Sequence, residues 1–193
     1  AAEPLYHPPL LAGALEAGPF GDYVLSVGRL EHNKRVDLVV RALALTDRSV
    51  RLVIAGHGSA RLGLEQLASR LEVADRVSFL GIVDDRQLVE LYAGALAVIY
   101  PPLDEDYGYV TLEAFLARKP VVTTTDAGGP LEFVVDGGNG LVADVAPESI
   151  AAAIARLAAD RSLARRLGEA GFERARTITW DGVVDRLVGQ QFG

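Results

Sequence analysis

Short apolar runs alternate with longer amphipathic segments along most of the chain. The runs are rich in β-branched residues, and they predict six strands, at residues 23–27, 50–55, 76–80, 96–100, 120–124 and 140–143. Between the runs, apolar residues recur every three or four positions, as at Val36, Val39, Val40 and Leu43, a spacing that predicts helices. Strands that alternate with crossover helices form a parallel sheet. The pattern therefore predicts an α/β fold, with a Rossmann-like parallel sheet of about six strands and helices on both faces.

The last third of the chain has a different pattern. Helical spacing continues there without a strand, and it predicts helices over residues 149–159, 162–177 and 179–189. Gly168 and Gly171 weaken the middle helix, because glycine is a poor helix former. The last helix carries an apolar stripe of Trp180, Val183, Val184, Leu187 and Val188. That stripe packs either on the sheet of this domain or on a part of the protein outside it.

The first residues show no sustained period. Residues 1–21 hold four of the nine prolines, which predicts a linker or edge segment. We therefore divide the chain into this segment, a Rossmann-like domain over residues 22–176 and a C-terminal helix over residues 177–193.

Composition narrows the possible chemistry. Of the 193 residues, 50% are hydrophobic and 23% are charged, which excludes a disordered chain. The absence of cysteine excludes disulfides and thiolate metal sites, and three scattered histidines are a poor basis for any other metal site. The net charge of −7 argues against nucleic-acid binding, because that requires a basic surface. Any phosphate must therefore be bound locally.

Ligands of parallel sheets bind beyond the carboxyl ends of the strands, so the loops there are the candidate sites. The loop after the first predicted strand, Gly28 to Arg35, concentrates three positive charges, on Arg29, Lys34 and Arg35. A planar guanidinium and a mobile ammonium together suit a diphosphate. The alternative is a solvated group of charges around a helix start.

The loop at residues 100–116 is the most informative. Gly108 precedes a predicted helix, so the amides from Gly108 to Thr111 point at an anion, and Glu105 and Glu113 flank that place. Carboxylates are poor phosphate ligands but good acceptors for hydroxyl groups, such as a ribose at one end of a diphosphate and a sugar at the other. Asp104 and Asp106 could instead suggest a metal site, but one loop without distant ligands coordinates a metal poorly.

Three motifs in this order resemble the C-terminal, donor-binding domain of family 4 glycosyltransferases, which belong to the group 1 type. They are Gly-Arg-x4-Lys at residues 28–34, Glu-x7-Glu at residues 105–113 and GGPLE at residues 128–132. The resemblance runs from about Tyr6 to the last helix. It implies the GT-B fold of two facing Rossmann-like domains, of which this chain would be the C-terminal half, and retaining transfer of a hexosyl group from a nucleotide-diphosphate sugar.

The resemblance also implies a role for each matched position. Arg29 and Lys34 would bind the donor diphosphate, and with Glu105, which would contact the transferred sugar, they would form the catalytic group. Glu113 would hold the ribose diol. The remaining donor-binding positions would be Gly28, Ile82, Val83, Asp85, Gly108, Tyr109, Val110 and Thr111, with residues 82–85 next to the base. Relatives often read EGFG where this chain has EDYG at 105–108, so the sugar stays undetermined.

The resemblance implies further expectations about the whole protein. No metal or other cofactor is expected, and the acceptor, a sugar, lipid-linked sugar or small molecule, would bind an N-terminal domain absent here. The C-terminal helix would pack toward that domain, and the chain alone would not turn over. We expect a cytoplasmic location, including the cytoplasmic face of a membrane. The alternatives are a sugar-nucleotide epimerase or phosphorylase of the same fold, and a non-catalytic Rossmann-like binding or regulatory module.

Overall fold

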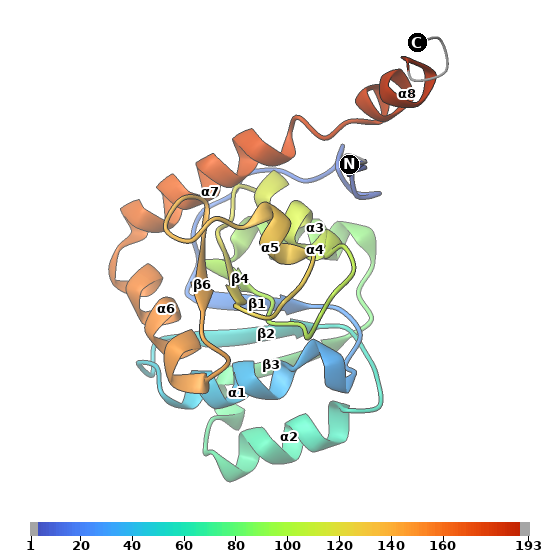
Figure 1. Cartoon of the computed structure of the whole chain (residues 1–193). Helices are drawn as coiled ribbons and strands as arrows, with labels where there is room; N and C mark the ends of the chain where they lie inside the picture. Colours follow the sequence, from blue (N-terminus) through green and yellow to red (C-terminus); the bar gives the residue numbers. More distant parts are fainter. Residues whose placement is uncertain (1–3, 190–193) are drawn as a thin grey trace.

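The computed structural model describes residues 4–189, which form one parallel sheet with helices on both faces (Figure 1). The sheet has six strands in the order β3-β2-β1-β4-β5-β6. Their bounds are β1 Tyr23–Val27, β2 Arg51–Ala55, β3 Val77–Gly81, β4 Ala97–Ile99, β5 Val121–Thr124 and β6 Gly140–Ala143. The predicted α/β class and the six parallel strands are confirmed, and the observed ends lie within one residue of the predicted ones.

Two layers of helices cover the sheet. The helices are α1 Val36–Ala44, α2 Arg61–Arg70, α3 Asp85–Gly94, α4 Tyr109–Leu116, α5 Pro130–Phe133, α6 Pro147–Ala159, α7 Arg161–Ala175 and α8 Trp180–Gly189, with 3-10 turns η1 His32–Lys34 and η2 Ala74–Arg76. Figure 1 shows α1 and α2 on one side of the sheet and α4 and α5 on the other. None of the helices in the described part is long and apolar enough to cross a membrane.

The strand residues divide between two apolar cores because successive side chains of a strand point to opposite faces. Val24 belongs to the core beneath α1, α2 and α6, whereas its neighbour Leu25 belongs to the core beneath α3, α4 and α5. The central strand β4 is buried throughout, and the edge strand β3 alternates between partly buried and exposed residues. The centre of the sheet is therefore fully covered by helices. The candidate site described below lies at the carboxyl ends of these central strands.

Gly168 and Gly171 let α7 approach α4 closely. A Cβ atom at Gly168 would lie 2.1 Å from the carbonyl oxygen of Arg118, and one at Gly171 would lie 2.3 Å from Cδ1 of Phe115. The sequence pattern marks both glycines only as weak points of the helix. The structure shows the compensation, which is close packing of α7 on the end of α4.

The segment before β1 is fixed to the body of the domain by two cations. The fully buried Lys119 donates from Nζ to the carbonyls of Gly18, at 2.8 Å, and Pro19, at 3.1 Å, and lies 4.0 Å from the ring of Phe20. Arg161 at the start of α7 donates to the carbonyls of Phe20 and Gly21. Residues 18–21 are thus part of the packed domain rather than a free connection.

The last helix, α8, projects from the body beside the first described residues (Figure 1). Val183 is buried, whereas Trp180, Val184, Leu187 and Val188 are each about half exposed. Arg186 donates to the carbonyl of Pro4. Most of the predicted apolar stripe therefore does not pack on the sheet of this domain, and packing toward another domain stays a prediction, as does the division of the chain at residues 21 and 176. Residues 190–193 of the predicted last segment lie outside the described part.

Replacing Gly168 by Ala should lower the free energy of unfolding by about 1 to 3 kcal/mol, because the new methyl group can be accommodated only by moving α7 away from a main-chain carbonyl. Urea denaturation measures this. The matched control is Gly63→Ala in α2, where a Cβ atom would meet nothing within 4 Å. This substitution should stabilise the protein by up to about 1 kcal/mol, because alanine is a better helix former than glycine. Equal effects of the two substitutions would contradict the packing role of Gly168.

The buried Lys119 should make stability depend on pH in the alkaline range. Burial, with a smaller contribution from Arg161, lowers the pKa of Lys119 to about 8. Between that value and the ordinary 10.5, the unfolded chain holds a proton that the folded chain has released, so the free energy of unfolding rises with pH. Lys119→Met removes this contribution. The wild type should therefore gain stability relative to the variant between about pH 8 and pH 10.5 in urea denaturation, and parallel curves would refute the assignment.

Candidate functional site

The candidate site lies at the carboxyl edge of the sheet, where the order of the strands reverses. β1 and β4 are neighbours, but the chain continues from β1 toward β2 and from β4 toward β5, on opposite sides. Loops diverge at such a point and leave a crevice that suits a ligand. The loops after β1 and β4 are joined by a hydrogen bond from the amide of Leu103 to the carbonyl of Asn33, at 2.7 Å. The two loops predicted to carry the chemistry therefore meet.

The three cations of the first loop have three different surroundings. Arg29 follows Gly28, whose φ of 135° allows the chain to leave β1, and its side chain is exposed. Among the described residues, no hydrogen bond or ion pair involves the Arg29 guanidinium. Lys34, in η1, forms an ion pair with Glu105 and lies 6.0 Å from the ring of Tyr100. The structure thus brings together Lys34 and Glu105, for which the sequence predicted roles at the diphosphate and at the adjoining sugar of one ligand.

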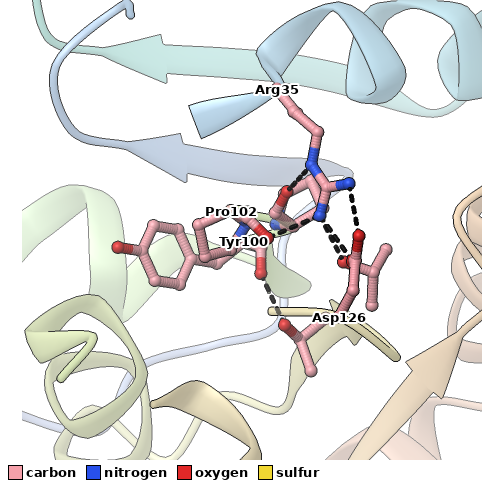
Figure 2. Close-up of polar contacts among 7 residues, drawn as sticks. Arg35, Tyr100, Pro102 and Asp126 are labelled. Carbon is pink, nitrogen blue, oxygen red and sulfur yellow. Dashed lines mark hydrogen bonds and ion pairs between the residues drawn. The ribbon is translucent and has the colours of Figure 1, made fainter. Parts of the chain in front are cut away.

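Arg35, the third cation of this loop, is occupied by bonds within the protein. Its guanidinium donates to the carbonyls of Pro101, at 2.9 Å, and Pro102, at 2.6 Å, and forms two bonds with Asp126, at 2.6 and 2.9 Å (Figure 2). A fifth bond reaches Oγ1 of Thr124, at 3.2 Å. Arg35 therefore ties the loops after β4 and β5 to the start of α1.

The glycine turn after β5 supports the loop that carries Glu105. The amide of Glu105 donates to the carbonyl of Ala127, at 2.9 Å, and the amide of Asp104 donates to the carbonyl of Asp126, at 3.1 Å. A Cβ atom at Gly128 would lie 2.6 Å from the carbonyl oxygen of Glu105. The turn at residues 126–129 therefore positions Glu105 by close backbone contact, which a side chain at residue 128 would prevent.

The helix α4 begins at the predicted anion-binding loop. Gly108 is its N-cap, with φ 79°, and a Cβ atom there would lie 2.8 Å from Cγ of Pro130. The amides of Tyr109 and Val110 have no helical partner at this position, as in the first turn of any helix. The hydroxyl of Thr111 is buried and has no hydrogen-bond partner among the described residues. These groups give the start of α4 a positive end that suits an anion.

Glu113 lies one turn further along α4, between α4 and α3. The buried Tyr92 donates from its hydroxyl to Oε2 of Glu113, at 2.7 Å. Burial raises the pKa of Glu113, and the charge of Asp85 adds to this, whereas the bond from Tyr92 opposes it. One carboxylate oxygen is thus held by the protein, which leaves the other for a ligand.

Two cavities adjoin these residues. One, of about 380 Å³, is lined by His7, Pro8, Pro9, Leu10, Tyr109, Glu113 and Trp180. The other, of about 490 Å³, is lined by Leu80, Ile82, Val83, Gln87, Glu90 and Leu91. Ile82 and Val83 therefore line a different cavity from Glu113. Asp85, at the start of α3, lines neither cavity, but its charge contributes to the raised pKa of Glu113.

Several residues at the site were not found from the sequence. Tyr92 and Tyr100 lie beside the two glutamates, and burial raises the pKa of both tyrosines. In the sequence, Tyr92 is only one of the apolar positions of a helix, so no local signal distinguishes it. No group of three or more His, Cys, Asp or Glu side chains that could hold a metal ion occurs within residues 4–189.

The structure therefore defines a Rossmann-like α/β domain in which the loops after β1 and β4 meet at the carboxyl edge of the sheet. The chain belongs to the group 1 glycosyltransferases, since residues 19–174 match that family.

The chain is similar to several curated glycosyltransferases. It is 39% identical over 140 residues to an uncharacterized glycosyltransferase of Methanocaldococcus jannaschii, covering 71% of this chain and 36% of that protein. It is 35% identical over 178 residues to D-inositol 3-phosphate glycosyltransferase of Thermomonospora curvata, covering 86% and 41%. The chain thus spans well under half the length of these relatives.

Solved structures of this fold are similar over about half their length. Sucrose-phosphate synthase from Thermosynechococcus elongatus matches with a TM-score of 0.81 and 29% identity, over 97% of this chain and 50% of that one. The Anabaena protein HepE, solved with UDP and glucose, matches with a TM-score of 0.82 and 24% identity, over 89% and 48%. The expected match to half of a GT-B structure is confirmed at the level of the fold.

Replacing Arg35 by Lys should lower the free energy of unfolding by about 2 kcal/mol, because an ammonium cannot reproduce the planar fork that satisfies two carbonyls and a carboxylate together. Thermal or urea denaturation measures the loss. Arg41→Lys is the matched control, since the exposed Arg41 lies 3.9 Å from Asp37 and the substitution should change stability by less than about 0.5 kcal/mol. If both variants had the same free energy of unfolding as the wild type, the hydrogen bonds of Arg35 would not hold the loops after β4 and β5 in place.

Proposed function

We propose that this chain is the donor-binding domain of a retaining family 4 glycosyltransferase, which binds a nucleotide-diphosphate sugar for hexosyl transfer to an acceptor. The observation that supports this best is the meeting of Lys34, Glu105 and Glu113 around the start of α4. Cations suited to phosphate and carboxylates suited to hydroxyl groups occur there at the same edge of the sheet. That combination suits a ligand in which a sugar, a diphosphate and a ribose are linked in this order.

The diphosphate would lie between the first loop and α4. Arg29 is exposed and unpaired among the described residues, Lys34 is within reach of the same space, and the amides of Tyr109 and Val110 supply donors from the helix side. Gly28 allows the backbone of the first loop to approach closely. Since the whole chain carries a net charge of −7, these groups form a local cationic site in an acidic protein.

The two glutamates would recognise the two ends of the donor. Glu105 would accept hydrogen bonds from the transferred sugar, and the free oxygen of Glu113 would accept bonds from the ribose diol. The base would lie toward Ile82, Val83 and Asp85. Several structures to which this chain is similar were solved in complex with UDP, so UDP and GDP are the first nucleotides to test.

The proposed chemistry follows from where charge develops. When the anomeric carbon leaves the donor, negative charge accumulates on the departing diphosphate. Arg29, Lys34 and the positive end of α4 stabilise that charge more in the transition state than in the ground state. We propose that these fixed charges serve in place of a metal ion.

The acceptor and its deprotonation belong to the remainder of a longer protein. The chain covers 36% of one curated relative and 41% of another, so a second domain is proposed to hold the acceptor. The chain alone should show no sugar transfer from UDP-sugars or GDP-sugars, and transfer by it would overturn the half-enzyme proposal. The proposed location is the cytoplasm or the cytoplasmic face of a membrane.

Calorimetric titration with UDP and GDP tests the diphosphate site. Arg29→Ala and Lys34→Ala should each weaken binding about tenfold or more, because each removes a charge-assisted hydrogen bond to phosphate. Arg48→Ala is the matched control, since Arg48 is 82% exposed and lies in the turn before β2, at the opposite edge of the sheet. Unchanged affinity in the first two variants would remove the diphosphate assignment. Absence of binding by the wild type would favour a non-catalytic module.

The role of Glu113 is tested by comparing UDP with 2′-deoxy-UDP. The wild type should prefer UDP by about tenfold, because the partly buried Glu113 carboxylate would accept a bond from the 2′-hydroxyl. Glu113→Ala should bind both nucleotides with nearly equal affinity. Its affinity for 2′-deoxy-UDP should be close to that of the wild type. A variant that retains the full preference for UDP would show that another residue holds the ribose.

A further inference from the structure

One imidazole joins three segments that are far apart in the sequence. His7 precedes the first strand, Tyr107 and Tyr109 flank the N-cap of α4, and Trp180 begins α8. The His7 ring stacks on Tyr107, with centroids 4.9 Å apart and planes at 7°, and on Trp180, with centroids 5.6 Å apart and planes at 21°. Figure 1 shows the first described residues and the start of α8 on the same side of the domain.

The backbone of His7 and its ring make separate contacts. The His7 amide donates to the Tyr107 hydroxyl, at 2.8 Å, and that hydroxyl donates to the His7 carbonyl, at 2.7 Å. The ring nitrogens Nε2 and Nδ1 lie 3.0 and 3.1 Å from the hydroxyl of Tyr109. Substitution of the side chain therefore removes the contact with Tyr109 but keeps the main-chain bonds to Tyr107.

Tyr109 depends on His7 more than Tyr107 does. Tyr107 also packs edge-on against Phe133, at 5.5 Å, and against Tyr6, at 6.2 Å. Tyr109, in contrast, is 41% exposed, and within residues 4–189 its hydroxyl has only the His7 ring as a hydrogen-bond partner. The Tyr109 ring also packs edge-on against Tyr107, with centroids 4.9 Å apart, so what the His7 ring adds is the hydrogen bond that holds the Tyr109 hydroxyl.

Tyr109 is also a wall of the cavity that contains Glu113. That cavity, of about 380 Å³, has His7 and Trp180 on its other sides. Tyr109 and Glu113 are four residues apart on α4, so their side chains occupy the same face of the helix. The position of the Tyr109 side chain therefore affects the space beside the Glu113 carboxylate.

We propose that His7 is a positioning residue for the nucleotide site, which acts by holding Tyr109 away from Glu113 and fixing the start of α4. Through His7, the segment before β1 and the helix α8 both influence nucleotide affinity. The proposal rests on the proposed function, because it concerns the same donor site.

The test measures UDP affinity by calorimetry for the wild type, His7→Ala, His7→Asn, Tyr109→Phe and the double variant that combines His7→Ala with Tyr109→Phe. His7→Ala should weaken UDP binding about three- to tenfold, the range expected for loss of one hydrogen bond and its stacking contacts. His7→Asn, whose amide can still bond to Tyr109, should restore most of the affinity. Tyr109→Phe should weaken binding in the wild type but add little to His7→Ala, because both remove the same contact.

A merely structural role is separated by the controls. The control is His57→Ala. The His57 imidazole is exposed and forms no hydrogen bond within residues 4–189, so this substitution should leave the affinity for UDP unchanged. Trp180 is the only tryptophan, so its fluorescence reports the stack directly and should change in His7→Ala whether or not UDP is present. Additive losses in affinity, or no rescue by His7→Asn, would overturn the positioning role.

Failure of this proposal differs from failure of the proposed function. If the wild type binds UDP or GDP and His7→Ala binds equally well, only the role of His7 is refuted. If the wild type binds neither nucleotide, the proposed function fails, and the role of His7 in nucleotide binding fails with it.

Discussion

The candidate site depends on the hydrogen bonds of one guanidinium. Arg35 has a left-handed backbone, with φ 48°, which returns its side chain across the carboxyl edge of the sheet. There it satisfies two loop carbonyls after β4 and a carboxylate after β5. Buried carbonyls without partners would be costly, so these bonds fix the path of the loop that carries Glu105. The ion pair between Lys34 and Glu105 follows, because Lys34 immediately precedes Arg35 in the chain.

The fold could be predicted from the sequence because buried parallel strands form continuous apolar runs. The segments Tyr23–Val27 and Gly140–Ala143 coincide with β1 and β6, and the other strands differ at their ends by one residue. Turn chemistry was less informative, since α5 is a single turn that no periodicity could define. The glycines of α7 also needed the structure, because their benefit is close contact with Arg118 and Phe115, about fifty residues away in sequence, rather than a local preference.

The site could be predicted only as a set of loops. Parallel topology places the loops after β1 and β4 at the same edge of the sheet, and the resemblance to a known family then implies the grouping of Arg29, Lys34 and Glu105. Which cation is free, paired or structural does not follow, because it depends on backbone angles such as that of Arg35. Contacts over a hundred residues, such as those between the His7 and Tyr107 segments, leave no trace in a local pattern. Tyrosines beside glutamates are likewise defined by packing rather than by spacing.

The ion pair of Lys34 with Glu105 has a consequence for binding under the proposed function. In the chain without ligand, the cation assigned to the diphosphate neutralises the carboxylate assigned to the sugar. A phosphate that attracts Lys34 leaves Glu105 partly unpaired in a half-buried place, which costs free energy unless a hydroxyl group takes over the carboxylate. A complete donor supplies both partners together, whereas a free nucleotide supplies only one. The two ends of the donor are therefore coupled through a single pair of side chains, and the pair favours the sugar-bearing nucleotide over its product.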